Sequence, residues 1–421
     1  MKKHTKPKAK ARKRFFDLKV GLFLLLLLLL PTQLGKHFFL PFSYLSGVRV
    51  DYLSPTLYLV DLVVVALFIA GFKSVMNFFR KRVFFFLAII LAFNVVLAKS
   101  PALAAYGSLR IFEWLVVFST ARQMATAIKS KYILLMFLTS GAVELALTVG
   151  QIILGHSMQG AFYFLGERLF SLGTPGIAKI AVNGAEYLRP YGTFSHPNSM
   201  AGFYLVVYFF VLLNRGFERH SILKYLSLFV FACLIFISFS KTAIMVFLVL
   251  NIATIFQNGK NLCRICAFSR LAVLTVLSLV FLIPLGDPMT IAKRIELTGN
   301  SLTIIKANPI AGTGLNNYLL AQSEFVSKYP LFFNQPVHNA LLLFLSETGL
   351  IGALIIYWMV KFARDTFNYG QWVLLGAVFL TGMLDHYWLT LIQNFLLLGV
   401  IFGVTGFRDR ALPEGSKSRS A

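Results

Sequence analysis

The sequence predicts an all-α, polytopic membrane protein, and three observations carry that prediction. Of the 421 residues, 57% are hydrophobic and only 13% are charged, whereas soluble globular chains carry about 25% charged residues. The mean hydropathy is +0.74. Apolar stretches long enough to cross a hydrocarbon layer of ~30 Å recur along the chain. Together these observations exclude a water-soluble enzyme, a disordered chain and a nucleic-acid-binding module.

About twelve apolar stretches are predicted to span the membrane as helices, since a span needs about 20 apolar residues. The first resembles a signal peptide, but no small-residue cleavage site follows Leu30, so we expect it to remain as a span. The three cysteines cannot form a disulfide framework, so helix packing in lipid must stabilise the fold. The predicted spans are 20–34, 55–72, 83–98, 101–120, 132–155, 197–214, 222–239, 242–257, 271–286, 338–360, 371–387 and 388–406.

The distribution of basic residues predicts the orientation of these spans. With the N-terminus placed inside, the inner segments hold 28 of the 40 Lys and Arg residues and the outer segments hold 11. This asymmetry follows the positive-inside rule and predicts that both termini face the cytoplasm. We expect the basic run from Lys2 to Lys19 to contact anionic lipid rather than nucleic acid.

Two outer connections, 156–196 and 287–337, are long enough to fold and carry function. In the second, Asp287-Pro288 predicts a helix start and Asn308-Pro309 a helix stop, so we expect a helical loop that caps an outward-facing cavity. The expected segments are a basic cytoplasmic tail (1–19), an N-terminal transmembrane bundle (20–155), an extracytoplasmic loop (156–196), central transmembrane helices (197–286), a large extracytoplasmic loop (287–337), C-terminal transmembrane helices (338–407) and a cytoplasmic tail (408–421).

Chemically active residue types gather near the predicted outer face, although they are far apart in the sequence. The map of spans places all but the deepest of them at this one membrane surface. We expect His196 to order its loop by hydrogen bonding, and Glu347, about 13 Å along the helix from His338, to order the cavity floor. The candidate site residues are Arg189, His196, Asn198, Lys241, Arg294, His338, Asn339 and Glu347.

These residue types suit the transfer of a group from a diphosphate. Arginine forks bind phosphate oxygens in a bidentate way, and lysine adds a point charge. A histidine can take the proton of an attacking hydroxyl near neutral pH. The outer loops show no paired aspartates for a divalent metal, so side-chain cations alone would neutralise the leaving diphosphate. Because the outer compartment lacks nucleotide sugars, the residues point to a lipid-diphosphate glycosyl donor, with no cofactor and no metal.

Four motifs in this order also resemble the O-antigen ligase and O-antigen polymerase superfamily. The resemblance implies a metal-independent, inverting glycosyltransferase that moves a glycan from undecaprenyl-diphosphate to an acceptor hydroxyl, on the outer face of the bacterial inner membrane. It also implies that His338 activates the acceptor, while Arg189 and Arg294 hold the donor diphosphate. Lys241 departs from the family, which more often has arginine there. The motifs are Arg189 to Asn198, Ser238 to Lys241, Asn308-Pro309 to Gly314, and His338-Asn339 to Gly352.

Other functions fit parts of the same pattern. Twelve spans with both termini inside are a common layout of secondary transporters, in which buried carboxylates could relay protons. The chain shows no matching pair of broken helices, however, and its candidate residues lie at a membrane face. A scaffold subunit of a glycan-export complex is a third reading. Ligase, polymerase and protein-glycosylating subtypes share the donor chemistry and stay open.

The expected partners are the lipid-linked donor, an acceptor glycolipid or glycan, and membrane lipids, but no nucleic acid; no oligomeric state is predicted.

Overall fold

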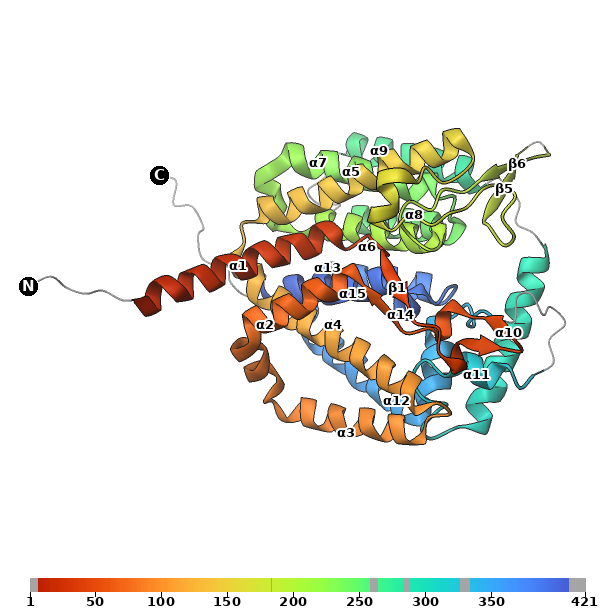
Figure 1. Ribbon diagram of the computed structural model, residues 1–421. Coiled ribbons are helices and arrows are strands. Elements are labelled where there is room, and N and C mark those ends of the chain that lie inside the picture. Colours follow the sequence, from red (N-terminus) through yellow and green to blue (C-terminus); the bar gives the residue numbers. More distant parts are fainter. Residues whose placement is uncertain (1–6, 183, 258–263, 283–287, 326–333, 409–421) are drawn as a thin grey trace, which may run out of the picture.

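The computed structural model of the protein describes residues 7–182, 184–257, 264–282, 288–325 and 334–408 (Figure 1). These residues fold mainly into helices, which confirms the predicted all-α membrane architecture. The helices are α1 (Pro7–Leu29), α2 (Leu59–Phe79), α3 (Arg82–Leu97), α4 (Pro101–Ala127), α5 (Ser130–Leu154), α6 (Pro197–Leu213), α7 (Ser221–Ile237), α8 (Lys241–Gln257), α9 (Arg264–Leu282), α10 (Pro288–Ala307), α11 (Tyr318–Gln322), α12 (Ala340–Thr366), α13 (Tyr369–Gly382), α14 (Tyr387–Thr390) and α15 (Ile392–Arg408).

Each predicted span overlaps a helix in the described part of the chain. Five helical segments there are both long and apolar enough to cross a membrane, and further apolar helices of 10–17 residues accompany them. The number of twelve spans therefore stays a prediction. The five segments are Leu59–Phe79, Pro101–Ala127, Ser130–Leu154, Arg215–Ile237 and Ala340–Thr366.

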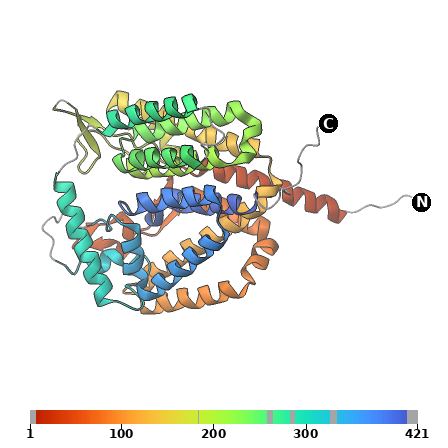
Figure 2. The ribbon, with the colours of Figure 1, turned by 180° about the vertical axis from the view of Figure 1, so that it is seen from behind.

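The helices form three layers that run in roughly the same direction (Figure 1). One outer layer contains α5, α7, α8 and α9, the other contains α3, α4 and α12, and α13 and α15 lie between them. The view from behind shows the same order (Figure 2). α15 packs along α4, while α6 packs against α7 and α13. Helix α10 lies across the end of the bundle, where the predicted outer loops gather (Figure 1).

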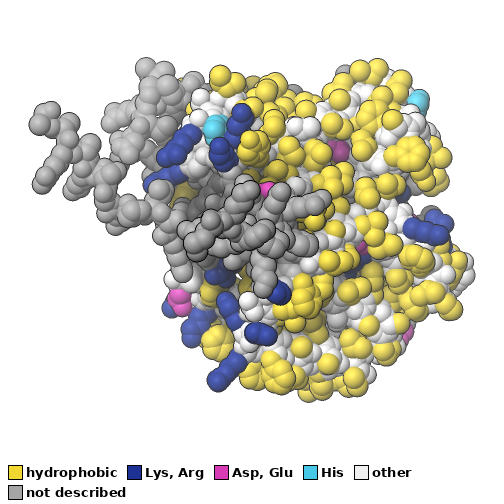
Figure 3. All heavy atoms as spheres, turned by 60° about the vertical axis from the view of Figure 1, so that its left-hand side comes forward, with side chains coloured by type: hydrophobic (Ala, Val, Ile, Leu, Met, Phe, Trp, Pro, Cys, Tyr) yellow, Lys and Arg dark blue, Asp and Glu magenta, His cyan; other side chains and the backbone are white. Residues whose placement is uncertain are grey.

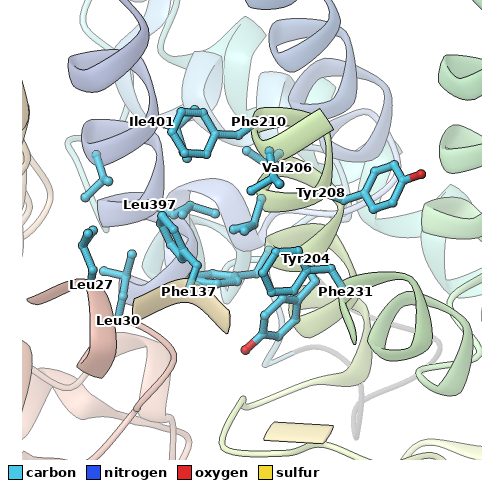
Figure 4. Close-up of a cluster of buried hydrophobic side chains, with 14 of the residues drawn as sticks. Leu27, Leu30, Phe137, Tyr204, Val206, Tyr208, Phe210, Phe231, Leu397 and Ile401 are labelled. Carbon is cyan, nitrogen blue, oxygen red and sulfur yellow. The ribbon is translucent and has the colours of Figure 1, made fainter. Parts of the chain in front are cut away.

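Helix α6 is the centre of the core. From Met200 to Val211 every residue is buried, and a helix that is apolar on all sides must be surrounded by protein or lipid. Tyr204 and Phe210 of this helix meet Phe137 of α5 and Leu397 of α15, and Leu27 of α1 closes the cluster (Figure 4). This packing fixes the start of α6, which carries Asn198.

Short strands shape the outer connections. β1 (Gly35–His37) pairs with β4 (Thr56–Tyr58), and β2 (Tyr44–Leu45) pairs with β3 (Val48–Arg49), all antiparallel. In the loop before α6, β5 (Lys179–Val182) and β6 (Ala185–Leu188) form another hairpin. Residues 35–54 were predicted only as a connection and 55–58 as the start of the span 55–72, whose helix in fact begins at Leu59. Strands of two or three residues are too short for a clear alternating pattern.

Two boundaries differ from the sequence-based expectation. The described part of the predicted basic tail, from Pro7, is helical and forms one helix, α1, with the first predicted span. The predicted spans 371–387 and 388–406 are separated by residues 383–391, which contain only the short helix α14. The apolar residues Leu384, Tyr387, Trp388 and Leu389 hid this connection in the hydropathy pattern. The predicted loop helix begins at Pro288, as expected, while its expected N-cap Asp287 lies outside the described residues.

Candidate active site

Arg189 joins three separate parts of the outer face. It directly follows β6, and its guanidinium Nε donates a hydrogen bond of 3.0 Å to the carbonyl oxygen of Ser238, in the turn between α7 and α8. Its Nη2 donates to Oδ1 of Asn198, at 2.7 Å, in the first turn of α6. The first two sequence motifs therefore contribute to one network, and Nη1 of Arg189 makes no hydrogen bond to any residue that the structure describes.

The network continues to a pair of imidazoles beside a carboxylate. Asn198 Nδ2 donates to Oδ2 of Asp385 at 3.0 Å, and Oδ1 of Asp385 lies 3.7 Å from Nδ1 of His338. The ring of His386 is 5.3 Å from the ring of His338, centroid to centroid. We call His338, Asp385 and His386 the imidazole cluster. It unites the start of α12 with the connection between α13 and α14.

The charges of this cluster are set by burial and by mutual contact. Burial raises the pKa of Asp385, but the imidazoles of His338 and His386 outweigh it and lower that pKa well below its ordinary value. Burial lowers the pKa of His386 to about 4, aided by the positive charges of His338 and Arg294 and opposed by Asp385. At neutral pH the cluster therefore holds an ionised carboxylate beside a neutral His386.

Arg294 supplies a second cation next to the cluster. It lies in the second turn of α10, and its charge contributes to the lowered pKa of both Arg189 and His386. Burial, the larger cause, lowers the pKa of Arg189 to about 10, so Arg189 stays charged at neutral pH. The Nε atom of Arg294 is buried and has no hydrogen-bond partner among the described residues. A buried guanidinium N–H without a partner is costly, so the position favours an anionic ligand.

The other predicted residues take supporting positions or lie apart. His196 is the N-cap of α6: its Nδ1 accepts a hydrogen bond of 3.1 Å from the backbone N–H of Asn198. Burial, with the charge of Arg189, lowers the pKa of His196 to about 3, so it is neutral. Asn339 is the N-cap of α12: its Oδ1 accepts a hydrogen bond from the backbone N–H of Leu342, and its Nδ2 donates to the carbonyl oxygen of Met383.

Lys241 begins α8, three residues after Ser238. Within the described part of the chain, no hydrogen bond or ion pair joins it to the arginines or to the imidazole cluster. Its predicted contact with phosphate thus gains no support from the geometry and stays a prediction.

Glu347 lies where α12 is interrupted. Gly349 has a φ of 59°, which breaks the helix, and the backbone N–H of Leu350 donates to the carbonyl of Pro309 at 2.8 Å. A Cβ at Gly349 would lie 2.6 Å from the carbonyl oxygen of Ile310, so only glycine fits this conformation and this close approach. The break joins the third and fourth motifs and turns Glu347 toward a cavity, whose wall it helps to form.

Two residues of the cluster were not predicted as site residues. They are Asp385 and His386, which both lie between α13 and α14. The signal that could have found them is an adjacent Asp-His pair at the outer junction of two predicted spans, where charge is costly unless it has a function or a partner.

The imidazole cluster also has the residue types of a metal site. One ligand atom from each of His338, Asp385 and His386 lies within 4.8 Å of the others. Zinc sites commonly combine histidines with a carboxylate, and they need three or four ligands at about 2.0–2.2 Å from the ion. The cluster could hold such an ion after a small adjustment, and it could equally act as an acid–base group without one.

Comparison with known proteins supports the resemblance seen in the motifs. Residues 226–357 match the family model described as O-antigen ligase. This match covers Lys241, Arg294, His338, Asn339 and Glu347, whereas Arg189 and Asp385 lie outside it. A search of curated proteins found no match. Residues 226–357 are thus similar to the O-antigen ligase family, and this match supports the predicted resemblance to the O-antigen ligase and polymerase superfamily.

Proposed function

We propose that the protein transfers a glycan from undecaprenyl-diphosphate to an acceptor hydroxyl on the outer face of the bacterial inner membrane. A ligase-like or polymerase-like role in surface polysaccharide synthesis follows from the family; the donor, the acceptor and the residue roles are our proposal. The observation that carries it is the buried, unpartnered Nε of Arg294 beside the imidazole cluster. A cation in this state next to a histidine suits a diphosphate leaving group.

The donor diphosphate would lie between Arg294 and Arg189. Arg189 is held by Ser238 and Asn198 through two of its nitrogens, so it offers a fixed positive charge rather than a mobile one. A fixed charge stabilises the developing negative charge without reorganisation cost. The two guanidiniums together would neutralise the leaving group.

The acceptor would be activated by His338. Its imidazole takes the proton of the acceptor hydroxyl as the oxygen attacks the anomeric carbon of the donor sugar. The bond from that carbon to the phosphate oxygen breaks, and its electron pair leaves with undecaprenyl diphosphate. Attack from the face opposite the leaving group inverts the anomeric centre. Asp385, which stays ionised, would stabilise the imidazolium formed at His338 and hold its orientation, as a carboxylate does in other acid–base pairs.

We propose that the end of the helix bundle at which α1 begins faces the cytoplasm. The connections α2–α3, α4–α5, α6–α7 and α12–α13 carry the predicted inner basic residues, and the structure brings them to the side where α1 begins. Lys and Arg side chains gather on this side, and hydrophobic side chains cover much of the neighbouring surface (Figure 3). This arrangement follows the positive-inside rule and leaves the imidazole cluster on the outer face.

The proposal treats the imidazole cluster as metal-free. Activity of the purified protein in a membrane-mimetic should then survive prolonged incubation with EDTA and be unaffected by added Zn²⁺ or Mg²⁺ at micromolar concentration. Loss of activity in EDTA, with recovery on adding one of these ions, would show that His338, Asp385 and His386 hold a metal instead.

Mass analysis of lipid-linked glycans in a deletion strain tests the function as a whole. Accumulation of long chains on undecaprenyl-diphosphate indicates a ligase, and accumulation of single repeats indicates a polymerase. Complementation with the intact gene should restore surface glycan. A deletion strain with normal surface glycan and no accumulated lipid-linked donor would contradict the proposal and favour a transport or scaffold role.

A further inference from the structure

A cavity of about 540 Å³ adjoins the imidazole cluster. Its volume falls within the ~300–1,000 Å³ typical of small-molecule sites. Its walls come from the segment 35–58 and the loop before α6, together with parts of α4, α12 and the α14–α15 junction. The segment 35–58 lies outside the four sequence motifs and was not predicted to be part of a site.

Two residues, Tyr52 and Thr390, connect this cavity directly to the cluster. Tyr52 lines the cavity, and its ring packs edge-on against the ring of His386 with 5.6 Å between centroids. Thr390 also lines the cavity, and its hydroxyl lies 2.8 Å from Nδ1 of His386. The ring of His386 in turn contacts that of His338. Contacts between rings therefore connect the cavity to His338 through Tyr52 and His386.

The charges of the cavity disfavour a phosphate. Arg110 is neutralised by Asp61 and Glu113, at 2.7 and 2.6 Å. Arg168 donates to the carbonyl oxygen of Ser195 at 2.9 Å. The carboxylate of Glu167 adds negative charge to the wall. A diphosphate is bound best by two cations together. In the wall, Arg168 is the only arginine without an ion pair among the described residues, whereas Arg189 and Arg294 both lie outside the cavity wall.

The remaining wall suits a neutral molecule with many hydroxyls. Five tyrosines line it, and each offers an apolar ring face together with a hydroxyl. The side-chain nitrogen of Gln33 and the hydroxyl of Ser195 are buried in the wall without a hydrogen-bond partner among the described residues. Buried polar atoms are nearly always satisfied, so these two are well placed to bond to a ligand. The tyrosines are Tyr52, Tyr58, Tyr106, Tyr163 and Tyr318.

We propose that this cavity is a saccharide-binding subsite, in which Tyr52 stacks on a sugar ring and Gln33 and Ser195 bond to its hydroxyls. The sugar belongs either to the acceptor or to the glycan of the donor, since both have the same chemistry. The assignment of the sugar to a transfer reaction rests on the proposed function, whereas the binding itself does not.

Equilibrium binding with one substrate at a time tests the subsite without turnover. The full-length protein in nanodiscs is titrated with two probes from the source cells: the oligosaccharide released from the surface glycolipid by mild acid, and the extracted diphosphate-lipid-linked glycan. Tyr52→Ala should weaken binding of one probe about tenfold, and Tyr52→Phe should bind as wild type. Tyr44→Ala is the matched control, because Tyr44 lies in the same segment, is 45% exposed and does not line the cavity.

Each outcome decides between the sources of the sugar or against the subsite. Weaker binding of the released oligosaccharide alone assigns the subsite to the acceptor, and weaker binding of the lipid-linked glycan alone assigns it to the donor sugar. Unchanged binding of both probes by a Tyr52→Ala protein with wild-type thermal stability overturns the proposal. If that variant does not fold, Ser195→Ala takes its place with the same criteria. Saccharide binding without any glycosyl transfer would instead refute the proposed function and leave the subsite standing.

Discussion

The two sides of the imidazole cluster are built from different kinds of residue. On one side, Arg189 and Arg294 present positive charge from two outer loops. On the other side, Tyr52, Gln33 and Ser195 line a cavity in which Arg110 is already paired with carboxylates. The two sides of His338 thus suit different ligands: one side suits an anion, and the other suits a neutral group with many hydroxyls. An enzyme that moves a sugar away from a diphosphate needs such a division, because an anion and a neutral sugar are bound by different chemical groups.

Replacement of the residue shared by both sides should have the largest effect. His338→Ala removes the group that accepts the acceptor proton, so transfer should fall by about 10²- to 10⁴-fold. Binding of each substrate alone should change little. The measurement is surface glycan, with accumulated lipid-linked donor, in a deletion strain that expresses the variant. His220→Ala, at the predicted cytoplasmic end of the bundle, is the matched control, and equal transfer by both variants would remove His338 from the chemistry.

Changes on the cationic side should affect the donor alone. Arg294→Ala removes the buried guanidinium, and the loss of one preorganised donor to a developing charge costs about 10²- to 10³-fold in rate. Arg294→Lys keeps the charge but not the fork, so it should recover only part of that loss. The KM for the acceptor should stay the same in both variants. Lys306→Ala, an exposed lysine of the same helix, should be neutral; a raised acceptor KM in Arg294→Ala would break the proposed division.

Replacement of Asp385 should reduce transfer less than replacement of His338 or Arg294, because Asp385 acts through His338. Asp385→Asn removes a charged contact that is worth ~1.5–3 kcal/mol, or about tenfold to a hundredfold in rate. The low pKa of this carboxylate means that its contribution to stability is present above its ordinary pKa, and is lost only as the pH falls through the still lower pKa of the folded state. The difference in thermal stability between the variant and wild type should therefore be the same at pH 5 and pH 8. A difference that shrinks toward pH 5 would show that Asp385 titrates there.

The fold was predictable to the extent that it depends on hydropathy. Apolar stretches located the helices, and Pro288 and Asn308-Pro309 bounded α10 correctly because proline and asparagine act locally on the backbone. The connection 383–391 was missed because Trp388 and its apolar neighbours are as hydrophobic as a span. The strands of 35–58 were missed because two- and three-residue pairs are set by tertiary contact and not by local pattern.

The cationic side of the site was more predictable than the cavity side for a physical reason. Arginine and histidine in an apolar chain are rare and costly, so Arg189, Arg294 and His338 stood out in the sequence. Asp385 and His386 were hidden because their junction was taken as part of two spans. Tyr52 is one of 16 tyrosines, and nothing local distinguishes it; its position depends on how the segment 35–58 packs over the cluster.

The smallest effect is expected at His196, which caps α6 beside Asn198. Its pKa of about 3, caused by burial and the charge of Arg189, keeps it neutral across the physiological range. Its Nδ1 caps α6, and asparagine is an equally good N-cap. His196→Asn should therefore change transfer by less than about twofold, the range of substitutions outside critical contacts, and should leave the pH dependence of transfer between pH 5 and 9 unaltered. Rates measured over that range in wild type and variant test this, with His196→Leu as the uncapped comparison. A changed pH dependence in His196→Asn would mean that His196 exchanges a proton during transfer, and that the division at His338 involves a second imidazole.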